Sequence, residues 1–141
     1  MTLSSVLPNL LLLAGVAQLL TIPAALLASK LDVLRPEDIA KAGPINARLF
    51  WVVFGGIQIV IVATALATIV GRHDLCRPGS YTTMSSGWMT LLWSYRWCCQ
   101  AFVLGPWFRT PRQAAVSRLL LALFAYVATT YGLTFARALA G

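Results

Sequence analysis

One stretch of the sequence, from Leu49 to Val70, reads LFWVVFGGIQIVIVATALATIV and contains no charged side chain. A helix needs about 20 consecutive apolar residues to cross the hydrocarbon core of a bilayer, and this stretch reaches that length. Backbone polar groups inside a bilayer must be satisfied within the segment itself, so a helix is the expected structure. The stretch therefore predicts a transmembrane helix.

Three further apolar stretches, at 10–28, 88–104 and 119–136, have lengths near that of a membrane span. Only 11% of the residues are charged, whereas a soluble domain carries about 25%. Such a chain cannot cover a globular surface with polar groups. We expect an all-α, polytopic integral membrane protein in which residues 1–141 form one transmembrane domain, an antiparallel bundle of four transmembrane helices with spans at about 10–28, 49–70, 88–104 and 119–136.

The basic residues flank these stretches and do not gather in one patch, which argues against nucleic acid as a partner. Seven lie in the first and third loops, and three lie in the second loop or near the C-terminal end. The seven are Lys30, Arg35, Lys41, Arg48, Arg109, Arg112 and Arg118, and the three are Arg72, Arg77 and Arg137. The positive-inside rule then places loops one and three in the cytoplasm and both termini outside. We expect a multi-pass protein of a bacterial inner membrane whose first partner is the lipid bilayer.

The first loop carries helix signals at both ends. Pro36 followed by two acidic residues is typical of a first helical turn, and the pair Gly43-Pro44 is typical of a stop. This pattern predicts a short helix over 36–42 at the cytoplasmic interface. It is either a solvated connector or a docking surface for a partner.

Small residues recur every three or four positions along the four spans. Lipid tails are as apolar as leucine, so helices in membranes associate through close packing of such residues. These stripes predict the faces that pack inside the bundle. They are Ala14, Gln18, Thr21, Ala25 and Ala28; Gly56, Ala63 and Ala67; Ser94, Cys98, Ala101 and Gly105; and Ala122, Ala125, Thr129, Gly132 and Ala136.

Arg96 lies at the centre of the third span, within the sequence WSYRWCCQAF. An arginine at this depth costs about 2.5–3.5 kcal/mol on insertion scales and is tolerated when it faces the bundle and is paired. All four acidic residues of the chain lie in loops. The remaining partners for Arg96 are glutamine and tyrosine side chains, backbone carbonyls, aromatic faces, or an anionic or carbonyl-bearing ligand.

Depth along each span places other polar and aromatic side chains near the level of Arg96. We expect them to meet in one layer at the bilayer midplane as a ligand-binding site. Three interpretations of Arg96 stay open: a packing device that fixes helix register, part of a ligand pocket, or a contact with a partner protein. The candidate ligand-binding residues are Trp93, Arg96, Trp97 and Gln100 from the third span, Gln18 from the first, Gln58 from the second and Tyr126 from the fourth.

The sequence lacks the residue groups on which catalysis, metal binding and proton pumping usually depend. His73 is the single histidine, so the chain alone cannot ligate a haem through two histidines. Cys98 and Cys99 are adjacent, and neighbouring residues of a helix point about 100° apart, which is poor geometry for one metal ion. We expect no catalytic residues, no metal site and no cofactor other than a bound quinone or lipid.

Two short motifs resemble those of a group of small bacterial four-helix membrane proteins. In that group, R-x-x-F-W opens the second helix and W-x-x-R-x-x-x-Q-x-F lies in the third. The resemblance runs from Asn46 to Trp107, implies the four-helix architecture, draws attention to Arg96 and implies no particular activity. Here Arg48, Phe50 and Trp51 match the first motif with the arginine one residue closer, and Trp93, Arg96, Gln100 and Phe102 match the second.

Two functions remain open at this point. The first is a non-catalytic integral membrane subunit or scaffold protein of a larger membrane complex, bound to other membrane subunits or to copies of itself. The second is a small membrane binding, transport or lipid-modifying protein with a midplane pocket around Arg96 for a quinone, a lipid or an isoprenoid phosphate. The small size of the chain and its few catalytic groups favour the first, and an enzyme is not expected.

Overall fold

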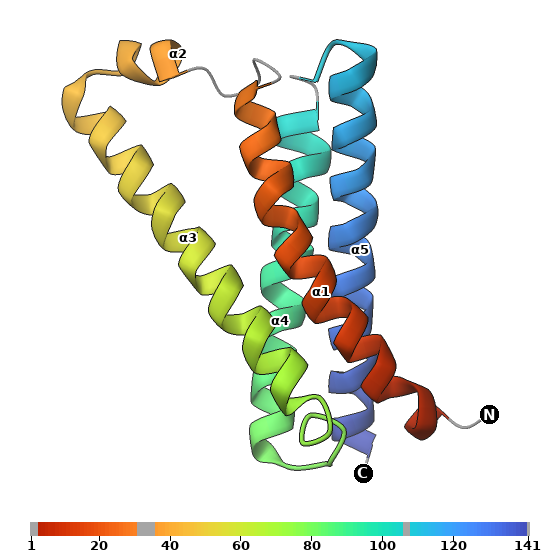
Figure 1. Cartoon of the computed structure of the whole chain (residues 1–141). Helices are drawn as coiled ribbons and strands as arrows, with labels where there is room; N and C mark the ends of the chain where they lie inside the picture. The colour runs from red at the N-terminus through yellow and green to blue at the C-terminus, as the bar shows by residue number, and fades with distance from the viewer. Residues whose placement is uncertain (1–2, 31–35, 106–107, 141) are drawn as a thin grey trace.

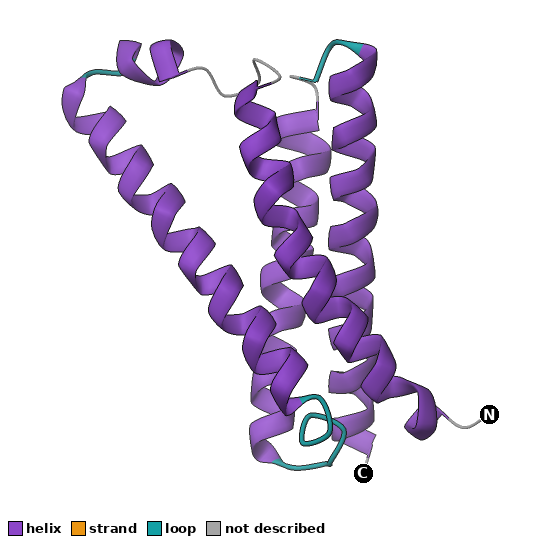
Figure 2. Cartoon of the chain, viewed as in Figure 1, coloured by secondary structure: helices purple, strands orange, loops and turns teal. Residues whose placement is uncertain are grey.

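A computed structural model describes residues 3–30, 36–105 and 108–140, and the regular elements in these ranges are all helices (Figure 2). The long helices run in alternating directions (Figure 1). The start of α1, the α3–α4 loop and the end of α5 lie at one end of the molecule, and α2 lies at the other (Figure 1). The elements are α1 (Leu3–Lys30), α2 (Pro36–Lys41), α3 (Pro44–Gly71), α4 (Ser80–Cys98), the π-helix η1 (Cys99–Leu104) and α5 (Pro111–Ala140).

Within the described ranges, three helical segments are long and apolar enough to cross a membrane: Ser5–Leu27 within α1, the whole of α3 and the whole of α5. The prediction of a helical membrane protein is confirmed to that extent. α4 does not join them because its first turns, SYTTMSSG, are rich in hydroxyl side chains. Together α4 and η1 form helix over 80–104, which contains the predicted third span. A fourth crossing by this segment therefore stays a prediction.

Local signals explain where α2, α3 and α5 begin and end. Gly43 adopts φ 94°, which glycine tolerates, and ends α2 before Pro44 starts α3. Thr110 and Gln113 form a capping box at the start of α5. The Gln113 amide donates to Thr110 Oγ1 at 3.3 Å, and the Thr110 amide donates to Gln113 Oε1 at 3.0 Å. The helix predicted over 36–42 is confirmed as α2.

The core forms where α5 packs on both α1 and α4, and where α1 packs on α3. Each helix contributes a buried face whose residues are three or four positions apart, which is the spacing of one helical side. The contact between α4 and α5 is close at Gly87, where an added Cβ would lie 2.9 Å from the ring of Phe135. The buried faces are Leu7, Leu11, Ala14, Gln18 and Thr21 on α1; Thr82, Ser86, Met89 and Trp93 on α4; and Ser117, Leu120, Phe124, Val127, Tyr131 and Thr134 on α5.

The predicted small-residue stripes are confirmed on α1, and on the other long helices most of their residues are exposed, although Gly132 of α5 faces Thr90 of α4. Ala14, Gln18 and Thr21 are buried, while the side chain of Ala28 lies outside the described residues. Elsewhere large side chains fill the interfaces, and Trp93 packs on Phe124 with ring centroids 5.6 Å apart. The stripe residues exposed as a result are Gly56, Ala63, Ala67, Ser94, Cys98, Ala122, Thr129 and Ala136.

α3 departs from the compact bundle that the sequence predicts. Its C-terminal half packs on α1 at Gly15, where an added Cβ would lie 2.5 Å from Ile69 Cγ1 and 3.1 Å from the carbonyl oxygen of Ala65. Its N-terminal half leans away from the other helices toward α2 (Figure 1). The compact arrangement is thus not confirmed, because within the described residues the N-terminal half of α3 meets the short helix α2 and has no long helix packed along it.

Candidate functional site

The guanidinium of Arg96 lies over two aromatic rings. Its Cζ is 5.5 Å from the ring centroid of Trp93 on α4 and 5.2 Å from that of Phe124 on α5. We call Trp93, Arg96 and Phe124 the Arg96 cluster. A desolvated cation–π contact is worth about 2 kcal/mol, so two rings offset much of the cost of placing this charge among apolar helices.

Two N–H donors of the Arg96 cluster are buried without a hydrogen-bond acceptor among the described residues. They are Nε1 of Trp93, whose side chain is fully buried, and Nε of Arg96, which is half-buried. An unpaired buried donor costs about 1–3 kcal/mol. The ion pairs in the described ranges lie in α2 and in the α3–α4 loop, away from this cluster. The cluster therefore offers donors to an acceptor that these residues do not supply.

Gln100 and Trp97 contact other groups than the guanidinium. Gln100 Nε2 donates to Ser117 Oγ on α5 at 3.0 Å, and Gln100 is buried. Trp97 packs edge to face on Phe102, with ring centroids 6.3 Å apart.

The π-helix η1 changes the register of the third predicted span. α-helical hydrogen bonding ends at Cys98, and the Gly105 amide donates to the Gln100 carbonyl, five residues back. π-type turns of this kind occur often at functional sites. Side chains from Cys99 onward no longer continue the α-helical face that carries Arg96. Of the predicted stripe, only Gln100 lies in η1, whereas Trp93, Arg96 and Trp97 lie in α4.

A second group of buried polar side chains joins α1, α3 and α5. Gln18 Nε2 donates to Tyr131 Oη at 2.9 Å, and Thr64 Oγ1 donates to Gln18 Oε1 at 3.2 Å. The hydroxyl of Thr68 also forms a hydrogen bond with Tyr131 Oη. We call Gln18, Thr64, Thr68 and Tyr131 the Tyr131 cluster. Its paired donors and acceptors give it the character of a structural network that fixes three helices against one another.

The last two predicted site residues make separate contacts. Tyr126 Oη donates to the Leu10 carbonyl at 3.1 Å. Gln58 is half-buried, and its Oε1 is buried without a donor among the described residues. Within the same ranges, no hydrogen bond or ring contact joins the Arg96 cluster to the Tyr131 cluster. The seven predicted residues thus fall into separate groups, where the sequence predicted one layer.

Sequence reasoning missed several side chains of these groups. Phe124 supplies the second ring under Arg96, and Ser117 accepts the hydrogen bond of Gln100. Thr64 and Thr68 lie four residues apart on one face of α3, a spacing that was visible in the sequence. The contacts of Phe124 and Ser117 arise because α5 packs on α4, and residue spacing within one helix does not indicate them.

An apolar groove of about 370 Å³ lies along the N-terminal half of α3. Its lining residues all come from this one helix. We call it the α3 groove. It is lined by Asn46, Leu49, Phe50, Val53, Phe54 and Ile57.

Comparison of the chain with protein-family models, with curated proteins and with solved structures gave no match. The class that the fold defines is a helical protein whose described residues include three helices long and apolar enough to cross a membrane. Its distinguishing features are the Arg96 cluster, the Tyr131 cluster and the α3 groove.

Proposed function

We propose that the chain is a non-catalytic subunit or scaffold of a larger membrane complex, and that the α3 groove binds a transmembrane helix of a different polypeptide. The proposal includes a bacterial inner membrane, a fourth crossing by α4 and η1, and a cytoplasmic position for α2. The carrying observation is the half-covered face of α3. One apolar face packs on α1 in the C-terminal half and continues uncovered in the N-terminal half.

The continuity of this face is visible in residue spacing. Phe50, Phe54 and Ile57 of the groove lead into Ile61 and Thr68, which are buried. Steps of three, four and seven residues keep all five on one side of the helix. The face of α3 that packs on α1 in the C-terminal half therefore continues into the N-terminal half, where another helix can pack on it.

Aromatic side chains give the α3 groove a defined shape. Phe50 and Phe54 stack with centroids 5.9 Å apart, and Trp51 meets Phe54 edge to face at 6.0 Å. Lipid solvates an apolar face as well as a helix does, so apolarity alone does not favour a protein partner. A stiff, shaped groove does favour one, because helix association in membranes depends on close packing.

The charge of the chain argues for a different polypeptide over a second copy. Loops one and three hold seven basic residues and three acidic ones, Asp32, Glu37 and Asp38, which leaves an excess of four positive charges. A second copy in parallel orientation would place the same excess beside the first. Like charges oppose that association, so a partner with acidic residues at this surface fits better.

Native mass spectrometry after gentle extraction from the source membrane tests this function. The wild-type chain is expected to carry a second polypeptide at fixed stoichiometry. The double variant Phe50→Ala/Phe54→Ala is expected to lose it, whereas Val52→Ala is expected to keep it. Val52 is 72% exposed and lies two residues from each phenylalanine, on the other side of α3. The proposal would be contradicted if the spectra show a homodimer or a chain that carries lipid alone. It would also be contradicted if the double variant keeps the second polypeptide.

The unpaired donors of the Arg96 cluster favour a second function. They suit a ligand with an acceptor group, such as a quinone carbonyl, a lipid headgroup or an isoprenoid phosphate. This function ranks second because Arg96 lines neither the α3 groove nor the cavities at 7–140 and 78–138 of the described residues. It predicts that Arg96→Ala loses a bound small molecule in the same spectra while the helices still fold. Equal stability and unchanged function in Arg96→Met would instead identify a structural charge.

A further inference from the structure

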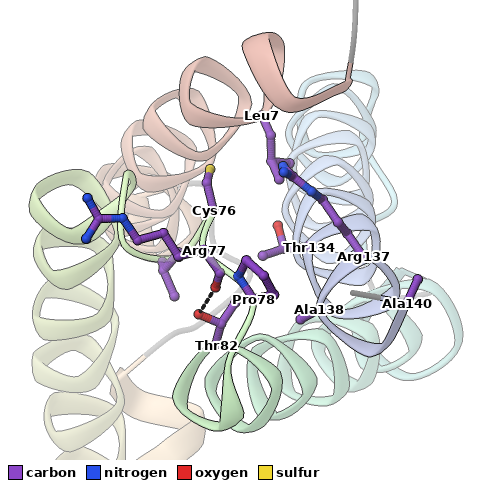
Figure 3. A pocket seen from close by; sticks show the side chains of 10 residues that line it. Leu7, Cys76, Arg77, Pro78, Thr82, Thr134, Arg137, Ala138 and Ala140 are labelled. Atoms are coloured by element: carbon purple, nitrogen blue, oxygen red, sulfur yellow. Dashed lines mark hydrogen bonds between the residues drawn. The ribbon is translucent and has the colours of Figure 1, made fainter.

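A cavity of about 240 Å³ (Figure 3) is lined by the α3–α4 loop and the end of α5, which lie at the end of the molecule opposite α2 (Figure 1). One buried water needs about 10–15 Å³ on this measure, so the space admits a larger polar group. It is separate from the α3 groove and from the Arg96 cluster. Its polar and charged lining comes from Cys76 and Arg77 of the α3–α4 loop, Thr82 of α4, and Thr134 and Arg137 of α5.

Arg137 extends from α5 toward Leu7 of α1 along this cavity (Figure 3). Its Nη1 atom is buried and has no hydrogen-bond acceptor among the described residues. A guanidinium stays charged at any physiological pH, and a buried N–H donor without an acceptor costs free energy. The cavity is therefore arranged to favour an anion beside Arg137.

The other polar groups of the cavity are already engaged. Thr82 Oγ1 donates to the Arg77 carbonyl at 2.8 Å, and Thr134 Oγ1 donates to the carbonyl four residues earlier at 2.9 Å. The Arg77 guanidinium points away from the cavity (Figure 3) and pairs with Asp74 at 3.4 Å. Among the described lining residues, Arg137 is thus the cation that faces the cavity and forms no ion pair with a carboxylate.

We propose that this cavity binds a phosphate group and that Arg137 is the residue that holds it. The planar guanidinium presents parallel N–H groups that match two phosphate oxygens. A lipid headgroup at this end of the helices carries such a phosphate. A free phosphate offers the same oxygens, so the chemistry is shared by two sources that an experiment can separate. The site lies at the opposite end of the molecule from the α3 groove and does not depend on the subunit function.

Cys76 supplies the readout, because its side chain lines the cavity. In a Cys98→Ser/Cys99→Ser background it is the one remaining thiol of the chain's three. The rate at which a maleimide alkylates Cys76 is measured for the full chain in detergent with inorganic phosphate. It is also measured in nanodiscs of phosphatidylglycerol and of phosphatidylcholine. Occupancy of the cavity is expected to slow alkylation.

The two arms of the experiment separate the sources. Slowing in phosphatidylglycerol but not in phosphatidylcholine, with no effect of inorganic phosphate, identifies a lipid headgroup. Slowing by inorganic phosphate in detergent identifies a free anion. Unchanged alkylation in both arms overturns the proposal.

Variants of the two cavity arginines test the residue assignment. Arg137→Gln is expected to raise the half-protecting concentration about tenfold or more, as the loss of a charge-assisted hydrogen bond predicts. Arg77→Gln removes one positive charge from the rim of the cavity. It is expected to change the half-protecting concentration by less than about threefold. Arg137→Lys keeps the positive charge but lacks the planar guanidinium, and it replaces Arg137→Gln if that variant does not fold. In Arg137→Lys, phosphate is expected to protect Cys76 from alkylation more weakly than in the wild type. The proposal is overturned if Cys76 is protected in either Arg137 variant as well as in the wild type. It is also overturned if Arg77→Gln weakens the protection of Cys76 as much as Arg137→Gln does.

Discussion

Replacement of Gly15 by alanine tests the packing that holds α3 on α1. The new Cβ would lie 2.5 Å from Ile69 Cγ1 and 3.1 Å from the Ala65 carbonyl oxygen, whereas non-bonded carbons favour about 3.5–4.0 Å. Isoleucine in a helix has essentially one χ1 rotamer, so Ile69 cannot turn aside and the helices must separate. Overpacking of this kind costs about 1–3 kcal/mol.

The matched control is Gly56→Ala on α3, where an added Cβ meets nothing within 4 Å. Both variants gain the helix propensity of alanine over glycine, about 1 kcal/mol, so their difference isolates the overpacking. Reversible unfolding in micelles is expected to show Gly15→Ala less stable than Gly56→Ala by about 1–3 kcal/mol. Ile69→Ala added to Gly15→Ala is expected to recover part of this loss. Equal stability of the two glycine variants would refute the close packing of α1 on α3.

Three further substitutions test other parts of the structure. Tyr131→Phe removes two hydrogen bonds of the Tyr131 cluster and is expected to lower the free energy of unfolding by about 1–2 kcal/mol; an unchanged unfolding curve would contradict the network. Thr110→Ala removes the cap of α5 and is expected to cost about 1 kcal/mol in the same assay, and no loss would show that the cap is not needed. Burial raises the pKa of the Cys76 thiol and Arg137 lowers it, so Arg137→Gln is expected to shift the pH profile of Cys76 alkylation upward, because the thiolate is the reactive form. A profile that does not move would contradict the proximity of the two groups.

The length of the apolar stretches in the sequence predicted the long apolar helices. The charge-free stretch from Leu49 to Val70 lies within α3, and the Pro36 and Gly43 signals bounded α2. The start of α4 was missed by eight residues because its first turns are polar. Hydroxyl side chains there donate to carbonyls four residues earlier, as in Ser86 to Thr82 at 2.5 Å and Thr90 to Ser86 at 2.7 Å. Such bonds satisfy polar groups inside a helix and leave no apolar run to detect.

The tilt of α3 had no signal in the sequence. Its residues are apolar on nearly every side, and a helix of that kind has no hydrophobic face from which its orientation can be predicted. The π-helix η1 was missed for a related reason, since the spacing argument assumed α-helical periodicity throughout. In contrast, the capping box of Thr110 and Gln113 was present in the sequence as T-x-x-Q and had not been used.

The candidate site was predictable where the contacts are local. Trp93 is three residues from Arg96 and does lie under its guanidinium. The second ring, Phe124, comes from another helix. Gln18 and Arg96 were assigned to one layer from their depth alone, and depth does not determine which way a side chain turns around its helix. Contacts between helices decide that, and they place Gln18 in the Tyr131 cluster, apart from Arg96.

Photocrosslinking from the α3 groove in the source membrane tests the proposed function most directly. p-Benzoylphenylalanine is placed at Val53, which lines the groove, and in a matched variant at Val52 on the other side of α3. The subunit function predicts that the Val53 variant crosslinks to one discrete polypeptide other than this chain, and that the Val52 variant does not. Adducts with lipid alone from both positions, or the same polypeptide captured equally by both, would contradict it.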